Sequence, residues 1–193
     1  MRVTVFLFDD FDLANVLGAA SVFGALPDTF RITYNSLYGD IINSTQGMKI
    51  WTDPLNPEEH SDVMIIPGGK GARRLIHLHD DTTALLKKAV NHTDICMMIA
   101  NGSGLLAQTG LLYRRNVASS SEDENWKRMF TAAVNWIPNE HWVSDGKYYS
   151  SSKSIYSMDM ALSIVADMID LDAALDIAAL QDYPWNPDDS TVF

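Results

Sequence analysis

Two stretches of the sequence have residue types that can form a reactive corner at the end of a sheet. They read MIIPGGKGARRL, residues 64–75, and DICMMIANGSGLLAQTGLL, residues 94–112. In each, an apolar strand-like run ends in a glycine-containing turn, after which a helical pattern begins. A strand–turn–helix corner of this kind can expose a nucleophilic side chain or aim backbone N–H groups at a ligand. The tip of the second corner is Ala100, however, and its methyl group cannot act as a nucleophile.

The elements that would position these corners alternate along the chain. Strands are expected over residues 3–8, 30–38, 63–66, 95–100 and 116–118, and helices over residues 12–26, 72–78, 81–90, 104–109, 154–167 and 171–181. Residues 41–51 read as a meander, and Asp145-Gly146 as the turn of a hairpin over residues 142–149.

This alternation predicts the fold class. Strands that alternate with helices favour a three-layer α/β/α sandwich with a mostly parallel sheet, here with an added hairpin. In such sheets ligands bind beyond the carboxyl ends of the strands, where both corners lie. The helix over residues 12–26 is expected to turn its apolar side chains inward, namely Leu13, Val16, Leu17, Ala20 and Phe23.

Composition and charge limit the classes of function. The chain has 193 residues, enough for a single compact domain over residues 1–193. Its net charge of −11 and the lack of a basic stripe argue against nucleic acid and membrane surfaces as partners. Its one cysteine, Cys96, cannot form an internal disulfide, and no apolar run approaches the ~18 residues of a membrane span. We therefore expect a cytoplasmic protein that binds neither nucleic acid nor a membrane.

Six blocks of the sequence, taken in order, match the motifs of one family. They are residues 8–23, Ile66-Pro67-Gly68-Gly69, residues 100–112, residues 144–151, residues 158–162 and residues 183–188. In these blocks the chain resembles the DJ-1/PfpI (ThiJ) family, whose fold is class I glutamine amidotransferase-like, a flavodoxin-like architecture. The resemblance implies that the second corner is a nucleophile elbow. It also implies a homodimer, because members of the family commonly dimerise.

The same resemblance points to what this sequence lacks. Family enzymes use an elbow cysteine, activated by a nearby acid and often by a histidine, and its thiolate attacks the substrate. The matching positions here are Ala100, Asn15 and Ser121, the last within Ser119-Ser120-Ser121. The resemblance therefore implies a vestigial site without thiolate or carboxylate, and a pocket more neutral than that of an active member.

Backbone groups of the two corners remain as candidates for binding. The N–H groups of Gly68, Gly69 and Asn101 are expected to bind an anion or a carbonyl oxygen at a helix N-terminus, with Gly102 and Ser103 beside them. We therefore expect a protein without cysteine-dependent catalysis that binds a small molecule at the elbow pocket, with no cofactor and no metal.

Two alternative functions stay open. One is a hydrolase, hydratase or lyase with rerouted chemistry, in which Asn101, Ser103 or Ser121 acts with a bound water. The other is a dimeric sensor or regulatory module whose assembly matters more than its pocket. For Ser103 the simpler interpretation is a helix N-cap, for Ser121 a polar turn, and for Cys96 a place in the core.

Histidines and the first acidic cluster have equally simple interpretations. His77 and His79 diverge on a helix, so a shared metal is not expected. The carboxylates of Asp9, Asp10 and Asp12 are expected to complement the dipole of the helix that follows them. The remaining histidines, His60, His92 and His141, are expected at the surface.

Overall fold

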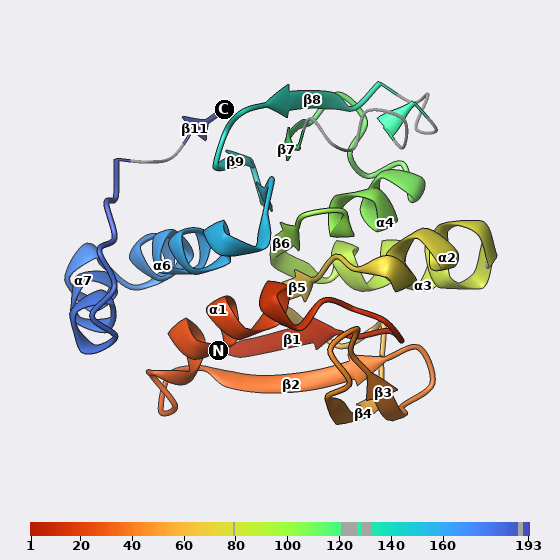
Figure 1. Ribbon diagram of the computed structural model, residues 1–193, viewed down its shortest axis with the longest axis horizontal. Helices are drawn as coiled ribbons and strands as arrows, with labels where there is room; N and C mark the ends of the chain where they lie inside the picture. The colour runs from red at the N-terminus through yellow and green to blue at the C-terminus, as the bar shows by residue number, and fades with distance from the viewer. Residues whose placement is uncertain (79, 121–126, 129–132, 189–190) are drawn as a thin grey trace.

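The centre of the molecule is a sheet of nine strands in the computed structural model, which describes residues 1–78, 80–120, 127–128, 133–188 and 191–193 (Figure 1). The strand order is β11-β9-β10-β6-β5-β1-β2-β4-β3. The strands are β1 (Arg2–Phe6), β2 (Arg31–Ser36), β3 (Asp40–Asn43), β4 (Lys49–Pro54), β5 (Ser61–Ile66), β6 (Thr93–Ile99), β9 (Trp142–Asp145), β10 (Tyr148–Ser151) and β11 (Thr191–Val192). Neighbours from β10 to β4 run parallel, whereas β9 pairs antiparallel with β10 and β3 with β4.

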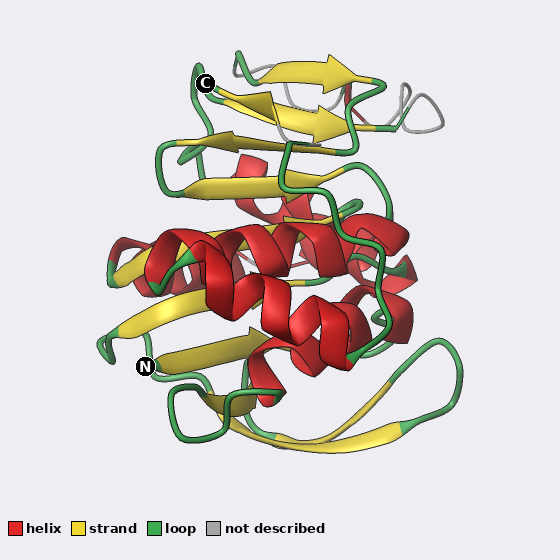
Figure 2. Ribbon diagram, turned by 90° about the vertical axis from the view of Figure 1, so that its left-hand side faces the viewer, coloured by secondary structure: helices red, strands yellow, loops and turns green. Residues whose placement is uncertain are grey.

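Helices cover both faces of this sheet (Figure 2). They are α1 (Leu13–Gly24), α2 (Lys70–Leu78), α3 (Asp80–Asn91), α4 (Gly102–Gln108), α6 (Ser157–Met168) and α7 (Leu171–Leu180), with a 3₁₀ turn, η2 (Ser154–Tyr156), before α6. In one layer α1 packs against α6 and α6 against α7, while α2 and α3 contact α4 in the other. The predicted α/β/α sandwich with a mostly parallel sheet is therefore confirmed.

Most predicted elements are present, with shifted ends. Tyr148 lies opposite Asp145 in the β9–β10 pair, so the hairpin around Asp145-Gly146 is confirmed. The short strand predicted at residues 116–118 is β7 (Asn116–Ser119), which pairs parallel with β8 (Asn135–Pro138). The meander forms the antiparallel pair β3–β4 at one edge of the sheet. Helix α4 begins at Gly102, two residues before the predicted start.

The buried face of α1 differs from the predicted one. Leu17, which was expected to point inward, is 54% exposed, and the buried residues are Asn15, Val16, Ala19, Val22 and Phe23. A pattern made of apolar residues alone cannot include Asn15, which is only 2% exposed. A polar side chain at a core position must find hydrogen-bond partners, so Asn15 directs attention to what it contacts.

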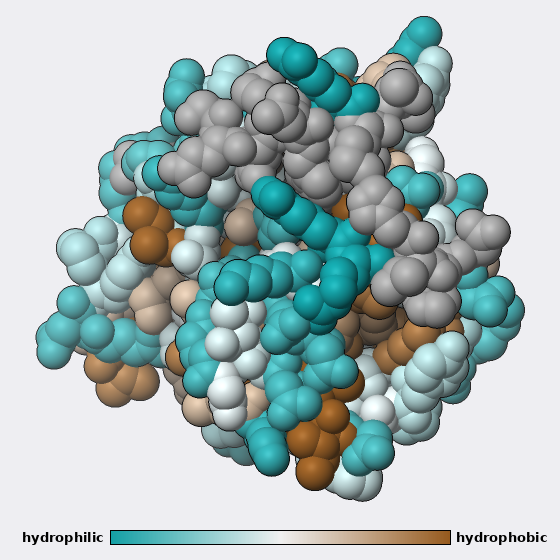
Figure 3. All heavy atoms as spheres, turned by 45° about the vertical axis from the view of Figure 1, so that its right-hand side comes forward, coloured by the Kyte–Doolittle hydropathy of each residue, from teal (hydrophilic) through white to brown (hydrophobic). Residues whose placement is uncertain are grey.

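The surface of the molecule is mostly polar on the face that Figure 3 presents. Figure 3 shows a face on which hydrophilic side chains predominate, with small hydrophobic patches between them. Among the described residues, none of the helices combines the length and the hydropathy that crossing a bilayer requires. The largest fully buried side chains lie instead in the sheet and in the helices against it, for example Phe6, Phe23, Met97 and Ile99.

The start of α2 gives a stability prediction. A Cβ added to Gly71 would overlap the carbonyl oxygen of Asp9 and lie 2.8 Å from Cδ2 of Phe8. We expect Gly71→Ala to lower the free energy of unfolding by about 3 kcal/mol, because backbone cannot move aside as a flexible side chain can. The matched control is Gly24→Ala, whose new Cβ would lie 3.9 Å from Cδ1 of Ile32. Urea denaturation should show this control to be unchanged or up to about 1 kcal/mol more stable.

Candidate functional site

The second corner is a strand–turn–helix turn with a strained residue at its tip. Strand β6 ends at Ile99 and α4 begins at Gly102, as the sequence predicts. Between them Ala100 has φ of 50°, in the left-handed region that a residue with a Cβ seldom occupies. Its N–H donates to the carbonyl oxygen of Ser151 at the end of β10, at 3.0 Å. The turn thus has the backbone of a nucleophile elbow, and a methyl group at its tip.

The elbow lies in direct backbone contact with the loop that follows β5. A Cβ on Gly102 would overlap the carbonyl oxygen of Ile66 and lie 2.7 Å from that of Pro67. A Cβ on Gly68 would overlap Oδ1 of Asn101. Only glycine fits at these two positions, and the two predicted corners therefore form one structure.

Two asparagine side chains accept hydrogen bonds from the backbone N–H groups of the loop that follows β5. The N–H of Gly68 donates to Oδ1 of the buried Asn15 at 3.2 Å, and the N–H of Gly69 donates to Oδ1 of Asn101 at 2.8 Å. Asn101 also donates from Nδ2 to the carbonyl oxygen of Gly69 at 3.0 Å. The N–H groups of Gly68 and Gly69, which are predicted to bind an anion or a carbonyl oxygen, thus donate to carboxamide oxygens of the chain itself, and binding of a ligand there stays a prediction. A carboxamide can accept and donate at once, and that is why Asn101 pairs with both groups of one residue.

The structure also corrects the role of Ser103. It lies inside α4, is 3% exposed, and donates from Oγ to the carbonyl oxygen of Ala100 at 3.0 Å. The N-cap position is taken by Asn101, whose side chain makes no capping hydrogen bond because it faces Gly69. Gly102 is the first residue of the helix and is buried. Ser121 lies outside the described residues.

Cys96 is part of the core. It is fully buried in β6, and burial raises the pKa of its thiol to about 12. The thiolate is the nucleophilic form of cysteine, so this thiol is unreactive near neutral pH. The predicted place of Cys96 in the core is confirmed.

Comparison with known proteins identifies the family. The sequence model of the DJ-1/PfpI family matches residues 1–167. This chain belongs to the DJ-1/PfpI family. No curated protein matches it.

Solved structures of several other proteins show the same fold. A ThiJ/PfpI family protein from Pseudomonas syringae is 19% identical, with a TM-score of 0.84 over 97% of this chain and 76% of the other. An AraC family transcriptional regulator from Pseudomonas putida is 20% identical, with a TM-score of 0.79 over 93% of this chain and 98% of the other. DJ-1beta of Drosophila melanogaster is 17% identical, with a TM-score of 0.82 over 95% of this chain and 98% of the other.

In this DJ-1/PfpI protein the acidic residues after β1 pair with neighbouring side chains and backbone. Asp12 caps α1 by accepting from the N–H of Ala14 at 3.1 Å, so its predicted role at the helix start is confirmed. Asp10 forms an ion pair with Arg74 at 2.6 Å, and Asp9 accepts from the N–H of Asn43 at 3.0 Å. These contacts account for the cluster without a bound cation.

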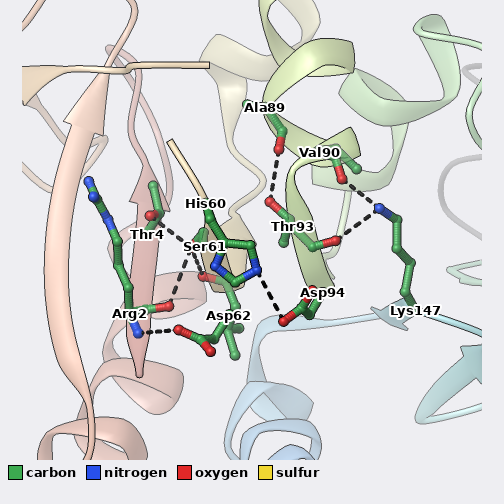
Figure 4. A network of polar contacts seen from close by, with 11 residues as sticks. Arg2, Thr4, His60, Ser61, Asp62, Ala89, Val90, Thr93, Asp94 and Lys147 are labelled. Atoms are coloured by element: carbon green, nitrogen blue, oxygen red, sulfur yellow. Dashed lines mark hydrogen bonds and ion pairs between the residues drawn. The ribbon is translucent and has the colours of Figure 1, made fainter. Parts of the chain in front are cut away.

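Three side chains that the sequence analysis did not associate could hold a metal ion. Ser61 pairs with Thr93 across β5 and β6, and this register places Asp62 beside Asp94, with His60 two residues before Asp62. One ligand atom of each lies within 4.8 Å of the others (Figure 4). His60 Nε2 is 3.2 Å from Asp94 Oδ2, and Asp62 accepts the N–H of Arg2 at 2.6 Å. Only strand register, which no motif reveals, brings them together.

His77 lies in α2, whereas His79 falls outside the described residues.

The hydrogen bond to Gly68 gives a second stability prediction. Replacing Asn15 with leucine, which has a similar volume but no acceptor, leaves the buried N–H of Gly68 unpaired. We expect Asn15→Leu to lower the free energy of unfolding by about 1–3 kcal/mol in urea denaturation. Leu17→Ala is the control on the same helix, because Leu17 is 54% exposed, and it should change stability by less than about 0.5 kcal/mol. Equal effects of the two variants would contradict the role given to Asn15.

Burial of Cys96 gives a prediction on thiol chemistry. At pH 8 an ordinary cysteine is about one-quarter thiolate, whereas a thiol with a pKa of about 12 is about 10⁻⁴ thiolate. We expect iodoacetamide to label the native protein at least about 10³ times more slowly than the protein unfolded in guanidinium chloride. Mass spectrometry over time measures both rates. Native labelling within tenfold of the unfolded rate would show that Cys96 is accessible.

Proposed function

We propose that this DJ-1/PfpI protein lacks cysteine-dependent catalysis and binds a small molecule at its elbow. The observation that carries the proposal is Ala100, which has the strained backbone of an elbow tip, with φ of 50°, and no reactive group. Strain of this kind persists only where the surrounding structure imposes it. The fold therefore still forms the turn, although the side chain at its tip cannot form a covalent intermediate.

The neighbouring groups support the same proposal. Asn15, at the position that the resemblance gives to an acid, uses its carboxamide to accept the N–H of Gly68. It has no proton to exchange near neutral pH, so it cannot act as a general acid or base. Cys96 is sealed in the sheet and cannot replace the missing nucleophile.

The contacts of Asn101 indicate the kind of molecule that would bind. This half-buried carboxamide accepts from the N–H of Gly69 and donates to the carbonyl oxygen of the same residue. A ligand that enters here must replace both interactions, and a small primary amide has the matching acceptor and donor. A charged ligand would contact two neutral carboxamides, neither of which supplies an opposite charge. We therefore propose small amides and related carbonyl compounds as the ligand class.

The two alternatives differ in their support. Rerouted hydrolysis is disfavoured because Ser103 and Asn101 are both committed to hydrogen bonds within the turn, and Ser103 is only 3% exposed. The sensor or regulatory alternative draws support from exposed apolar side chains in the helical layer of α1, η2 and α7, where Leu17, Ile155 and Leu180 are 54%, 66% and 74% exposed. The fold also occurs in a protein named as a transcriptional regulator. This alternative predicts a homodimer in light scattering and no stabilisation by small amides.

Activity assays and one variant test the proposed function. We expect the protein to show no hydratase, glyoxalase or peptidase turnover under conditions in which an active family enzyme, the positive control, does. Treatment with iodoacetamide should leave the measured activity of the protein unchanged. We expect Asn101→Ala, which vacates the N–H and carbonyl groups of Gly69, to strengthen the thermal stabilisation by acetamide and propionamide. Gln108→Ala, an exposed change at the end of the same helix, is the control. Robust turnover that alkylation abolishes would overturn the proposal, and turnover lost in Asn101→Ala would favour rerouted chemistry.

A further inference from the structure

A cavity lies at the start of β1 and beside β2, away from the elbow. It has a volume of about 620 Å³ and is lined by polar and charged side chains. Positive charge comes from the guanidinium groups of Arg2 and Arg31, and negative charge from Asp53, Glu59 and Asp62. The presence of both signs favours a ligand that itself carries groups of both charges.

Strand register explains why these side chains converge. Arg31, Thr33 and Asn35 alternate along β2 and therefore point to one face of the sheet, whereas Ile32 points to the other, toward Gly24 of α1. Arg2 of β1 pairs with Arg31, and Asp53 of β4 pairs with Asn35. Along this face of the sheet, the guanidinium groups of Arg2 and Arg31 therefore lie at one end. The carboxylate of Asp53 and the carboxamide of Asn35 lie at the other.

Unpaired buried atoms gather in this cavity. Among the described residues, Nε of Arg2, Oγ1 of Thr33 and Oδ1 of Asn35 are buried and have no hydrogen-bond partner. Asn35 is only 4% exposed, and its Nδ2 reaches the carbonyl oxygen of Pro54 at 3.4 Å. A buried polar atom without a partner costs about 1–3 kcal/mol, and such atoms are rare in native proteins. Three such atoms belong to residues that line one cavity, and a polar ligand there could supply the partners that they lack.

The charged groups are also available. Arg31 and Asp53 form no ion pair within the described part of the chain. Arg2 is paired with Glu59, and its backbone N–H with Asp62. In Figure 4 the Arg2 side chain extends away from Asp62, His60 and Asp94. Arg2 and Arg31 are paired residues of β1 and β2, and burial together with repulsion from the charge of Arg31 lowers the pKa of Arg2. An anionic group between them would relieve this repulsion.

We propose that this cavity binds a free α-amino acid as a zwitterion. The ligand carboxylate accepts from Arg31, from Nε of Arg2 and from the hydroxyl of Thr33. Its ammonium group donates to Oδ1 of Asn35 and pairs with Asp53. Thr33 and Asn35 lie two residues apart on a strand, about 7 Å. An α-amino acid spans this distance with one hydrogen bond of about 2.9 Å at each end.

Thermal shift and calorimetry with L-amino acids test the proposal. Each of the twenty L-α-amino acids is added at 10 mM, and for the strongest binder its N-acetyl derivative and its α-amide serve as controls that remove one charge. We expect at least one amino acid to raise the melting temperature, by about 5 °C at one hundred times its Kd, and both blocked derivatives to fail. Failure of all twenty, or equal binding of a blocked derivative, would overturn the proposal.

Variants locate the site. Asn35→Leu removes the unpaired acceptor and should weaken binding at least about tenfold, while the unliganded protein keeps or gains stability because an unsatisfied buried group is gone. Arg31→Gln, at an exposed position, should weaken binding to a similar extent. Because an exposed substitution does not disturb folding, this variant tests the site even if Asn35→Leu fails to fold. Asn91→Leu, an exposed change at the end of α3, is the control. Binding that survives Asn35→Leu and Arg31→Gln but is strengthened by Asn101→Ala would place the ligand at the elbow and overturn this assignment.

Discussion

Close backbone contact between three loops at the carboxyl edge of the sheet is the constraint on which the elbow depends. A Cβ on Gly69 would overlap the carbonyl oxygen of Asp10 and lie 2.7 Å from the N–H of Asp12, and Gly68 and Gly102 have as little room. Helices α1, α2 and α4 all begin within a few residues of this contact. Their starting positions are therefore fixed relative to one another. A change that separated the loops would move all three helix starts.

Within this contact, neutral side chains pair with the backbone N–H groups. The carboxamides of Asn15 and Asn101 satisfy the N–H groups of Gly68 and Gly69 without a proton or an ion. Because Asn101 is attached to the same turn, its oxygen is present at a high effective concentration beside Gly69. Any free molecule that binds Gly69 would have to compete with this oxygen.

The sequence predicts the fold well and the state of the site only in part. Alternating strand and helix patterns, and the glycine turns after β5 and β6, fix the sheet and both corners because they depend on local residues. The hydrogen bonds of Asn101 with Gly69 join residues 32 positions apart and depend on one rotamer, which no spacing encodes. The polarity of Asn15 in a core position was the available signal, and a purely apolar reading of α1 overlooked it. His60, Asp62 and Asp94 meet only through the register of β5 with β6.

The sealed position of Cys96 determines how the protein responds to oxidants. The chain has one cysteine, which is fully buried, so peroxide meets no accessible thiolate to convert into a sulfenic acid. Among the described residues, the exposed side chains that contain sulfur are thioethers, Met1 at 40% and Met48 at 48% exposure. Oxidation is therefore expected to produce methionine sulfoxide at the start of β1 and just before β4, whereas the tip of the elbow is a methyl group that peroxide does not modify.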